Sequence, residues 1–173
     1  MARAPRQFRL ALTGGLLAWN DERGVDRIDD RAMVGFDLEN RIQRFFSLRL
    51  GAAYGRTTVT GDSAAVDADQ YVVDLTLAGH LAIGPLQRLG VVPFGTIGIG
   101  AVVHAPDGDG LATKSQSAAV YGGGLDADLT PSVGLRAEWR RYRVNAETIF
   151  DPTDRTGTDR SADRFFASLY LKL

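Results

Sequence analysis

Apolar and polar residues alternate with a period of two along most of this chain of 173 residues. The stretch DQYVVDLTLAGHLAIG, residues 69–84, shows the pattern: Tyr71 and Leu75 belong to one set of alternate positions, and Asp74 and His80 belong to the other. Because successive side chains of a β-strand point to opposite faces, this stretch is predicted to be a strand with one apolar and one mixed face. Seven further stretches alternate in the same way and are also predicted as strands, at residues 7–19, 31–40, 45–56, 91–104, 117–129, 133–143 and 164–173.

The connections between these stretches alternate in length. Three are short, at residues 41–44, 84–90 and 130–132. Four are longer and rich in Asp, Gly, Ser and Thr, at residues 20–30, 57–69, 104–116 and 144–163. An antiparallel meander puts short and long connections at opposite ends, and pairing of its first and last strands removes the sheet edges. We therefore predict an all-β, eight-stranded antiparallel up-and-down barrel that forms a single domain over residues 1–173.

The composition of the mixed face indicates whether the apolar side chains point into the barrel or outward to lipid. In a soluble barrel of the lipocalin type this face meets water, and Lys, Glu, Thr and Gln are expected to dominate it. Here it combines Gly and Ala with charges of both signs, which suits a crowded polar lumen and leaves the apolar face for lipid. Strands of about 10 residues, tilted by about 45°, span an apolar band of about 25 Å. The predicted fold is thus a transmembrane β-barrel.

The lumen is predicted to hold a network of paired charges, because an unpaired buried carboxylate is costly. The network is interpreted as structural rather than as the lining of a gated passage, and its expected members are Arg49, Asp74, Asp126, Asp128, Arg136, Glu138 and Arg140. Outside, an aromatic girdle is expected at the membrane interfaces, formed by Trp19, Tyr54, Tyr71, Tyr121 and Trp139.

Composition narrows the possible partners. The net charge is -1 and no basic run with interleaved aromatics occurs, so nucleic acid is not an expected partner. The chain has no cysteine, which excludes disulfides and thiolate metal sites. No apolar run reaches the roughly 18 residues of a transmembrane helix. The N-terminal stretch MARAPRQFRLALTGG is interpreted as a mature terminus behind a start Met, from which any signal peptide has been removed.

From FRLALTGGLLAW to FFASLYLKL, the chain resembles the small outer-membrane β-barrels of Gram-negative bacteria, the OmpA/OmpX-like family. The stretch VVPFGTIGIGAVV is similar to a strand of such barrels in which Gly alternates after a Pro, and GLRAEWRRYR is similar to their penultimate strand. The resemblance implies a place in the bacterial outer membrane, with membrane lipid and lipopolysaccharide as partners. We expect the barrel to be a monomer.

The resemblance also admits enzymes, because some eight-stranded outer-membrane barrels deacylate or acylate lipid A. The deacylase type carries a His followed two residues later by Ser, whereas Leu-Ala follows His80 and Ala-Pro follows His104. His80 is therefore interpreted as a hydrogen-bonding residue of the lumen and His104 as an ordinary residue at the end of a loop. The glycine-rich runs GTIGIG and GGG could suggest phosphate-binding loops, but no helical pattern follows either run, so a nucleotide site is not predicted. We predict no catalytic residue and no cofactor.

Two acidic turns carry the carboxylates and glycines that calcium sites use: PDGDG at residues 106–110, and the cluster of Asp26, Asp29 and Asp30. Neither has the ligand spacing of a known calcium loop. They are interpreted as solvated turns, and no metal site is predicted.

The predicted function is a structural or surface-interaction role, in which the four longer connections face outward and present a possible binding surface for an extracellular ligand. Two alternatives remain open. One is a soluble barrel that carries an apolar ligand, and the other is a narrow channel or a lipid-modifying barrel enzyme.

Overall fold

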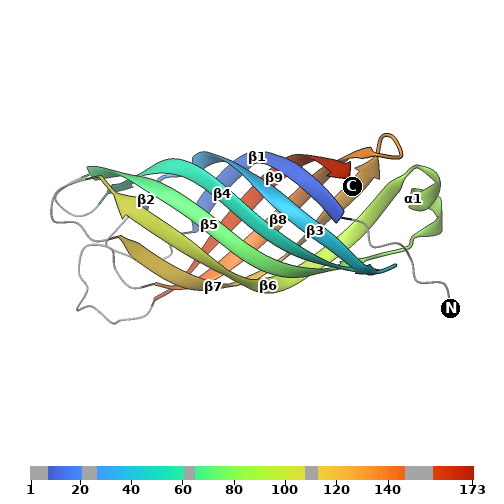
Figure 1. Ribbon diagram of the computed structural model, residues 1–173. Coiled ribbons are helices and arrows are strands. Elements are labelled where there is room, and N and C mark those ends of the chain that lie inside the picture. Colours follow the sequence, from blue (N-terminus) through green and yellow to red (C-terminus); the bar gives the residue numbers. More distant parts are fainter. Residues whose placement is uncertain (1–7, 21–26, 61–64, 108–112, 147–157) are drawn as a thin grey trace.

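The computed structural model of the chain describes residues 8–20, 27–60, 65–107, 113–146 and 158–173. In this part of the chain, eight long antiparallel strands form a closed barrel (Figure 1), as predicted. The strands are β1 (Phe8–Asn20), β3 (Arg31–Gln43), β4 (Phe46–Thr60), β5 (Ala65–His80), β6 (Val91–Pro106), β7 (Lys114–Asp128), β8 (Val133–Ala146) and β9 (Thr158–Lys172). A two-residue strand, β2 (Arg27–Ile28), pairs with the end of β4.

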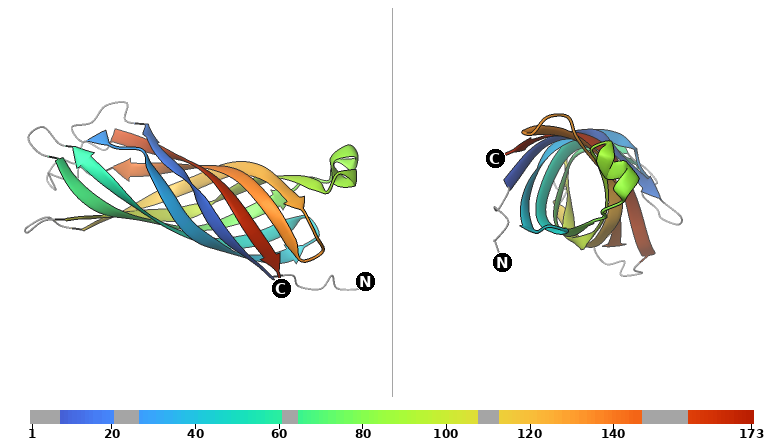
Figure 2. Two further views of the ribbon diagram at one scale, coloured as in Figure 1. Left: turned by 90° about the horizontal axis from the view of Figure 1, so that it is seen from above. Right: turned by 90° about the vertical axis from the view of Figure 1, so that its right-hand side faces the viewer.

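Closure depends on the pairing of β1 with β9. The two strands pair from Arg9 opposite Lys172 to Asn20 opposite Ser161. Each remaining long strand pairs with the long strands that precede and follow it in the chain. The end-on view in Figure 2 shows the resulting ring. Among the strands that the structure describes, no long strand is left with an open edge, which removes the template on which other chains could pair.

The strands extend further toward the longer connections than the sequence pattern predicts. β4 and β5 continue to pair as far as Thr60 opposite Ala65, although a connection was expected from residue 57. The outer parts of these strands are rich in Thr and Asp, so the apolar–polar alternation weakens there although the backbone pairing of the two strands continues. We call this end of the barrel the loop end.

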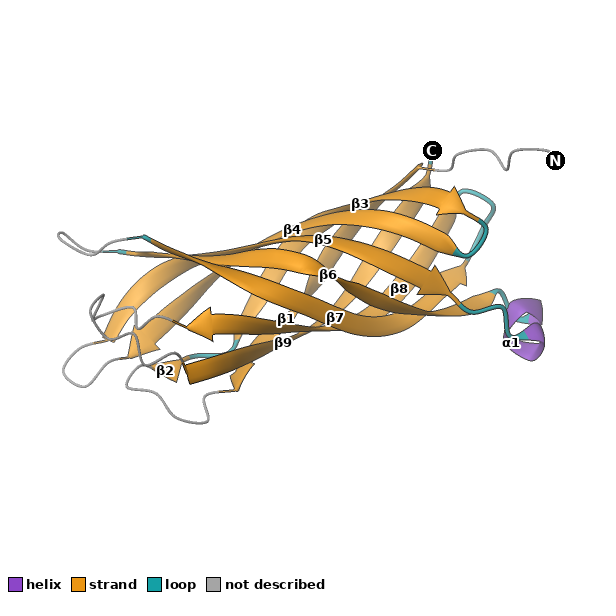
Figure 3. Ribbon diagram, turned by 90° about the horizontal axis from the view of Figure 1, so that it is seen from below, coloured by secondary structure: helices purple, strands orange, loops and turns teal. Residues whose placement is uncertain are grey.

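The opposite end, which we call the turn end, carries the three short connections and the C-terminus. The connection predicted at residues 84–90 contains α1 (Gly84–Arg88), a single helical turn that the alternation did not predict (Figure 3). Pro85 in its first turn suits a helix start, and Gly90, which follows the C-cap residue Leu89, adopts a positive φ of 72°. Within the described residues, no helix is long and apolar enough to cross a membrane.

The apolar side chains point outward. Along the wall, large hydrophobic residues are exposed, for example Leu12 at 72% and Ile99 at 69%. Between them, alternate residues such as Thr13 and Gly98 face the interior. The alternative of a soluble barrel that carries an apolar ligand is incompatible with this arrangement, because its apolar face would have to line the lumen.

The lumen is packed in two layers. The layer toward the loop end is mainly apolar, which the expectation of a polar lumen missed, and the buried polar side chains of Gln70, His104 and Arg160 lie at the same end. Its apolar cluster consists of Leu17, Trp19, Ile28, Met33, Ala53, Val59, Ala68, Val72, Val102, Ala118, Val120, Tyr142, Val144 and Ala162. The layer toward the turn end is charged and forms the site described below.

One residue of the expected aromatic girdle was assigned to the wrong face. Trp19 is only 8% exposed and belongs to the inner apolar layer, because it shares the parity of Arg9 and Thr13 along β1. The other four girdle residues lie on the outer wall as two neighbouring pairs of rings. The centroids of Tyr54 and Tyr71 are 5.3 Å apart, and those of Tyr121 and Trp139 are 6.2 Å apart.

Candidate functional site

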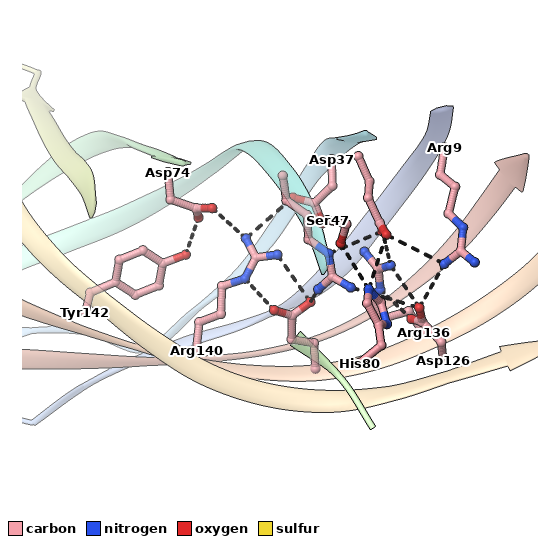
Figure 4. A network of polar contacts seen from close by, with 12 residues as sticks. Arg9, Asp37, Ser47, Asp74, His80, Asp126, Arg136, Arg140 and Tyr142 are labelled. Carbon is pink, nitrogen blue, oxygen red and sulfur yellow. Dashed lines mark hydrogen bonds and ion pairs between the residues drawn. The ribbon is translucent and has the colours of Figure 1, made fainter. Parts of the chain in front are cut away.

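A network of buried charges fills the lumen between its middle and the turn end (Figure 4). The strand alternation explains its origin, because each member occupies an inward position of its strand. The guanidinium groups belong to Arg9, Arg49, Arg136 and Arg140, and the carboxylates belong to Asp37, Glu39, Asp74, Asp126 and Glu138. All of these residues are buried.

Arg140 on β8 anchors the half of the network nearest the middle of the barrel. Its Nη1 donates to Oδ1 of Asp74 at 2.7 Å, and its Nε donates to Oε1 of Glu138 at 2.7 Å. The hydroxyl of Tyr142 donates to the other oxygen of Asp74, also at 2.7 Å. Asp74 lies on β5, which is not a neighbour of β8 in the sheet. The contacts of Arg140 and Tyr142 with Asp74 therefore cross the lumen, whereas Glu138 lies on β8 itself.

Arg136 anchors the half nearest the turn end. Its Nε donates to Oδ1 of Asp126 at 2.7 Å, and its Nη2 donates to Oε2 of Glu39 at 2.5 Å. Arg9 donates to the second oxygen of Asp126 at 2.9 Å. Arg49 joins the two halves, because it contacts Glu39 at 3.2 Å and Glu138 at 3.3 Å.

Aromatic rings cover the faces of these guanidinium groups. Arg49 lies 4.1 Å from the ring centroid of Phe94, and Arg140 lies 4.8 Å from that of Phe166. A desolvated guanidinium is attracted to the face of a ring. The rings thus add to the attraction that the carboxylates exert on these guanidinium groups.

Gly51 makes the close approach of the charges possible. It lies directly between Asp37 on β3 and Asp74 on β5 in the strand register. A Cβ at this position would lie 2.5 Å from Oδ1 of Asp37, 2.9 Å from Oδ1 of Asp74 and 3.0 Å from Nη1 of Arg140. The space of the missing side chain is therefore occupied by the network.

The structure brings six of the seven residues singled out from the sequence into contact: Arg49, Asp74, Asp126, Arg136, Glu138 and Arg140. Asp128 lies elsewhere. It is exposed at the rim of the turn end, where it accepts hydrogen bonds from Tyr170 at 2.6 Å and Lys172 at 2.7 Å. Asp128 has the inward parity of β7, but the strand ends at this residue and its side chain reaches solvent.

Four members of the site were left out of the predicted network: Arg9, Asp37, Glu39 and Tyr142. The signal that could have found them is the same alternation, since each shares its parity with a buried neighbour on its strand. The alternation places Arg9, Asp37 and Glu39 on the mixed faces of their strands, but it does not show which inward charges meet across the lumen.

His80 lies in the lumen, close to the charged network. The Oγ of Ser47 lies 3.0 Å from its Nε2, and Oε1 of Glu39 lies 3.6 Å from the same nitrogen. A Ser-His-carboxylate triad needs the hydroxyl and the carboxylate on opposite ring nitrogens. Here both contact Nε2, so this group does not have the geometry of a triad.

His104 was expected at the end of a loop, but it lies within β6 and is fully buried. Its Nε2 lies 2.9 Å from the side-chain nitrogen of Gln70, and its ring packs 5.5 Å from that of Trp19. The strand continues two residues beyond His104, because the backbone pairing of β6 extends past the last residues of the apolar alternation.

The acidic turns were interpreted as solvated. Asp29 pairs with Arg31, Asp107 pairs with Arg56, and Asp30 accepts from the backbone N–H of Trp19. Asp26 and Asp109 lie outside the described residues. In the described ranges, no group of three or more His, Cys, Asp or Glu side chains could hold a metal ion.

Comparison with protein families matches residues 2–163 to the outer membrane protein beta-barrel domain. The protein belongs to this family. The outer-membrane β-barrel family places it in the bacterial outer membrane, as predicted, with the apolar wall facing lipid. In barrels of this kind, short turns face the periplasm and longer loops face outward.

Solved structures of outer-membrane barrels share the fold at low sequence identity. Neisserial surface protein A has 12% identity and a TM-score of 0.66, over 96% of this chain and 97% of its own. OprG from Pseudomonas aeruginosa has 12% identity and a TM-score of 0.69, over 97% and 96%. Ail from Yersinia pestis, the attachment invasion locus protein, has 15% identity and a TM-score of 0.65, over 97% and 99%. No curated protein sequence matches the chain significantly.

Proposed function

We propose that this barrel is a closed scaffold with no chemistry of its own, which serves as a structural and surface-interaction protein of the outer membrane. The observation that carries the proposal is the set of ion pairs that cross the lumen. Arg140 and Arg136 on β8 reach Asp74 on β5 and Glu39 on β3, so opposite walls are tied together. A narrow lumen filled in this way is suited to stability rather than to the passage of solutes.

The loop end is the part available for interaction. Its outer wall carries arginines above the apolar band, including Arg31, Arg56 and Arg141. Guanidinium groups suit the phosphates of lipopolysaccharide in the outer leaflet, and the four longer connections would present a site for an extracellular ligand. The names of Neisserial surface protein A and of the attachment invasion locus protein are compatible with a surface role. A closed barrel has no free edge, which supports a monomer.

Planar-bilayer recording combined with urea unfolding tests the closed scaffold. We expect the wild-type protein to show no stepwise conductance. Arg140→Gln leaves Asp74 and Glu138 without their shared cation, so it should lower the free energy of unfolding by roughly 3–5 kcal/mol. The matched control is Arg56→Gln, which breaks the exposed pair with Asp107 and should change that free energy by only about 0–1 kcal/mol.

Two results would contradict the scaffold proposal. One is a steady wild-type conductance that Arg140→Gln alters, which would identify the network as the lining of a passage. The other is an Arg140→Gln variant as stable as the wild type.

The lipopolysaccharide contact is tested separately by titrating lipid A into the detergent-folded protein. Replacing both Arg31 and Arg56 by Gln should weaken binding, and unchanged binding would rule out these residues as the contact.

A further inference from the structure

A small polar cavity lies at the turn end, next to the charged network. Its volume is about 150 Å³, and it lies between the turn that joins β3 to β4, the end of β5 and α1. The side chains that define its chemistry are Arg41, Arg44 and His80, with Gln87 beside them and Phe45 and Leu81 at the border.

The two arginines of this cavity differ from those of the lumen network. Each arginine of that network pairs with at least one carboxylate. Arg41 forms no ion pair with any residue of the described segments, and its Nε is buried without a hydrogen-bond partner. Arg44 lies over the ring of Phe45, 5.3 Å from its centroid, and forms no ion pair with the part of the chain that the structure describes. Glu39, Asp126 and Asp128 act on Arg41 only from beyond ion-pair distance, so within the described residues neither arginine of the cavity has a directly paired carboxylate.

His80 supplies a third donor on the inner side. Its side chain is 3% exposed, and its Nδ1 has no hydrogen-bond partner among the residues that the structure describes. Its other nitrogen, Nε2, faces Ser47 and Glu39. An anion ligand requires Nδ1 to carry the proton, which it does when Nε2 accepts from the hydroxyl of Ser47; in a neutral ring whose Nε2 donates to Glu39, Nδ1 is an acceptor. With Nδ1 protonated, a buried donor lies beside two arginines that form no ion pair with the described residues, which is the arrangement expected of an anion site.

We propose that this cavity binds a phosphate-type oxyanion, with Arg41 and Arg44 as charged donors and Nδ1 of His80 as the third. The guanidinium fork matches phosphate oxygens. Phe45 and Leu81 are exposed toward the lipid at 44% and 57%, so the cavity borders the apolar band at the depth of the phospholipid headgroups. The site is independent of the proposed surface function, because it lies at the opposite end of the barrel.

Nuclear magnetic resonance of the histidine rings tests the proposal directly. The chain has two histidines, so His104, buried toward the loop end, serves as an internal control for His80. The folded protein is held in a phosphate-free maltoside detergent at constant ionic strength. Inorganic phosphate is titrated in one arm and phosphatidylglycerol in the other. We expect a saturable shift of the His80 ring signals, while those of His104 stay in place.

Three variants make the result specific to the cavity. Arg41→Gln and Arg44→Gln each remove one charged donor and should weaken the apparent affinity about tenfold or more. Arg88→Gln removes an exposed charge of α1 that does not line the cavity, and should change the affinity less than about twofold. Arg44 lies on an exposed turn, so its variant should fold even if Arg41→Gln does not.

A response to both probes supports a general phosphate site. A response to phosphatidylglycerol alone supports a lipid headgroup as the ligand, and a response to phosphate alone supports a free ion. The proposal is overturned if neither probe gives a saturable shift of His80, or if Arg88→Gln weakens binding as much as Arg44→Gln does.

Discussion

Glycine and acid residues alternate around the inner wall where the charges meet. In the strand register, Asp37 lies opposite Gly51, Gly51 opposite Asp74, and Asp74 opposite Gly100. Each acid therefore has an empty position beside it, into which a long side chain from the far wall can extend. Arg140 takes that space. At the scale of single residues, the small residues of the lumen are as necessary to the network as the charged ones.

The exchange Gly51→Ala is expected to destabilise the barrel. Its Cβ would lie within 3.0 Å of Asp37, Asp74 and Arg140, whose positions are held by several ion pairs, and such overpacking typically costs about 1–3 kcal/mol. Gly14→Ala is the matched control, because no atom lies within 4 Å of its Cβ on the lipid face. Its stability should be unchanged or rise by up to about 1 kcal/mol. Urea unfolding in lipid vesicles measures both, and equal effects would show that Gly51 is not needed for space.

At the scale of strands, the alternation of the sequence carries most of the information about the fold. It predicts the strands, their faces and six residues of the network, because the two-residue period of a strand is independent of tertiary contacts. It does not predict where strands end, since pairing in the β4–β5 ladder continues through residues whose two faces are alike. Asp128 was misassigned for this reason, and α1 was missed because one helical turn leaves no periodic pattern.

Closure of the barrel depends on β9, which pairs on both sides. Ala167 lies in its middle, opposite Gly14 of β1 and Ala137 of β8, with its side chain toward the lipid. Ala167→Pro removes a backbone donor from this doubly paired strand and should prevent the folded barrel from forming. Gel migration of unboiled samples should then equal that of boiled ones. Ala167→Val adds only methyl groups on the lipid side and should keep the fast-migrating folded form; loss of that form in both variants would point to side-chain volume instead.

At the scale of the whole molecule, the barrel has one apolar surface outside and a second apolar layer inside. The inner layer lies toward the loop end and the charged network lies toward the turn end, so the lumen is occupied along its length by two different kinds of packing. Residue type alone does not distinguish the inner apolar layer from the outer wall. Leu17 belongs to the inner layer and Leu16 to the outer wall, and they differ only in whether their position along β1 points inward or outward. Both layers favour a scaffold over a passage.

The two tryptophans report on this inside-out arrangement. Trp19 belongs to the inner apolar layer, whereas Trp139 lies on the outer wall, where its Nε1 donates to Oδ1 of Asp163 at 3.0 Å. In vesicles of brominated lipid, the Trp19→Phe variant retains Trp139 and should be quenched strongly, because bromine on the acyl chains can reach a side chain on the lipid face. The Trp139→Phe variant retains Trp19, whose 8% exposure should leave its fluorescence nearly unquenched. Equal quenching of the two variants would mean that lipid reaches the lumen, and the assignment of the inner and outer faces of β1 would be wrong.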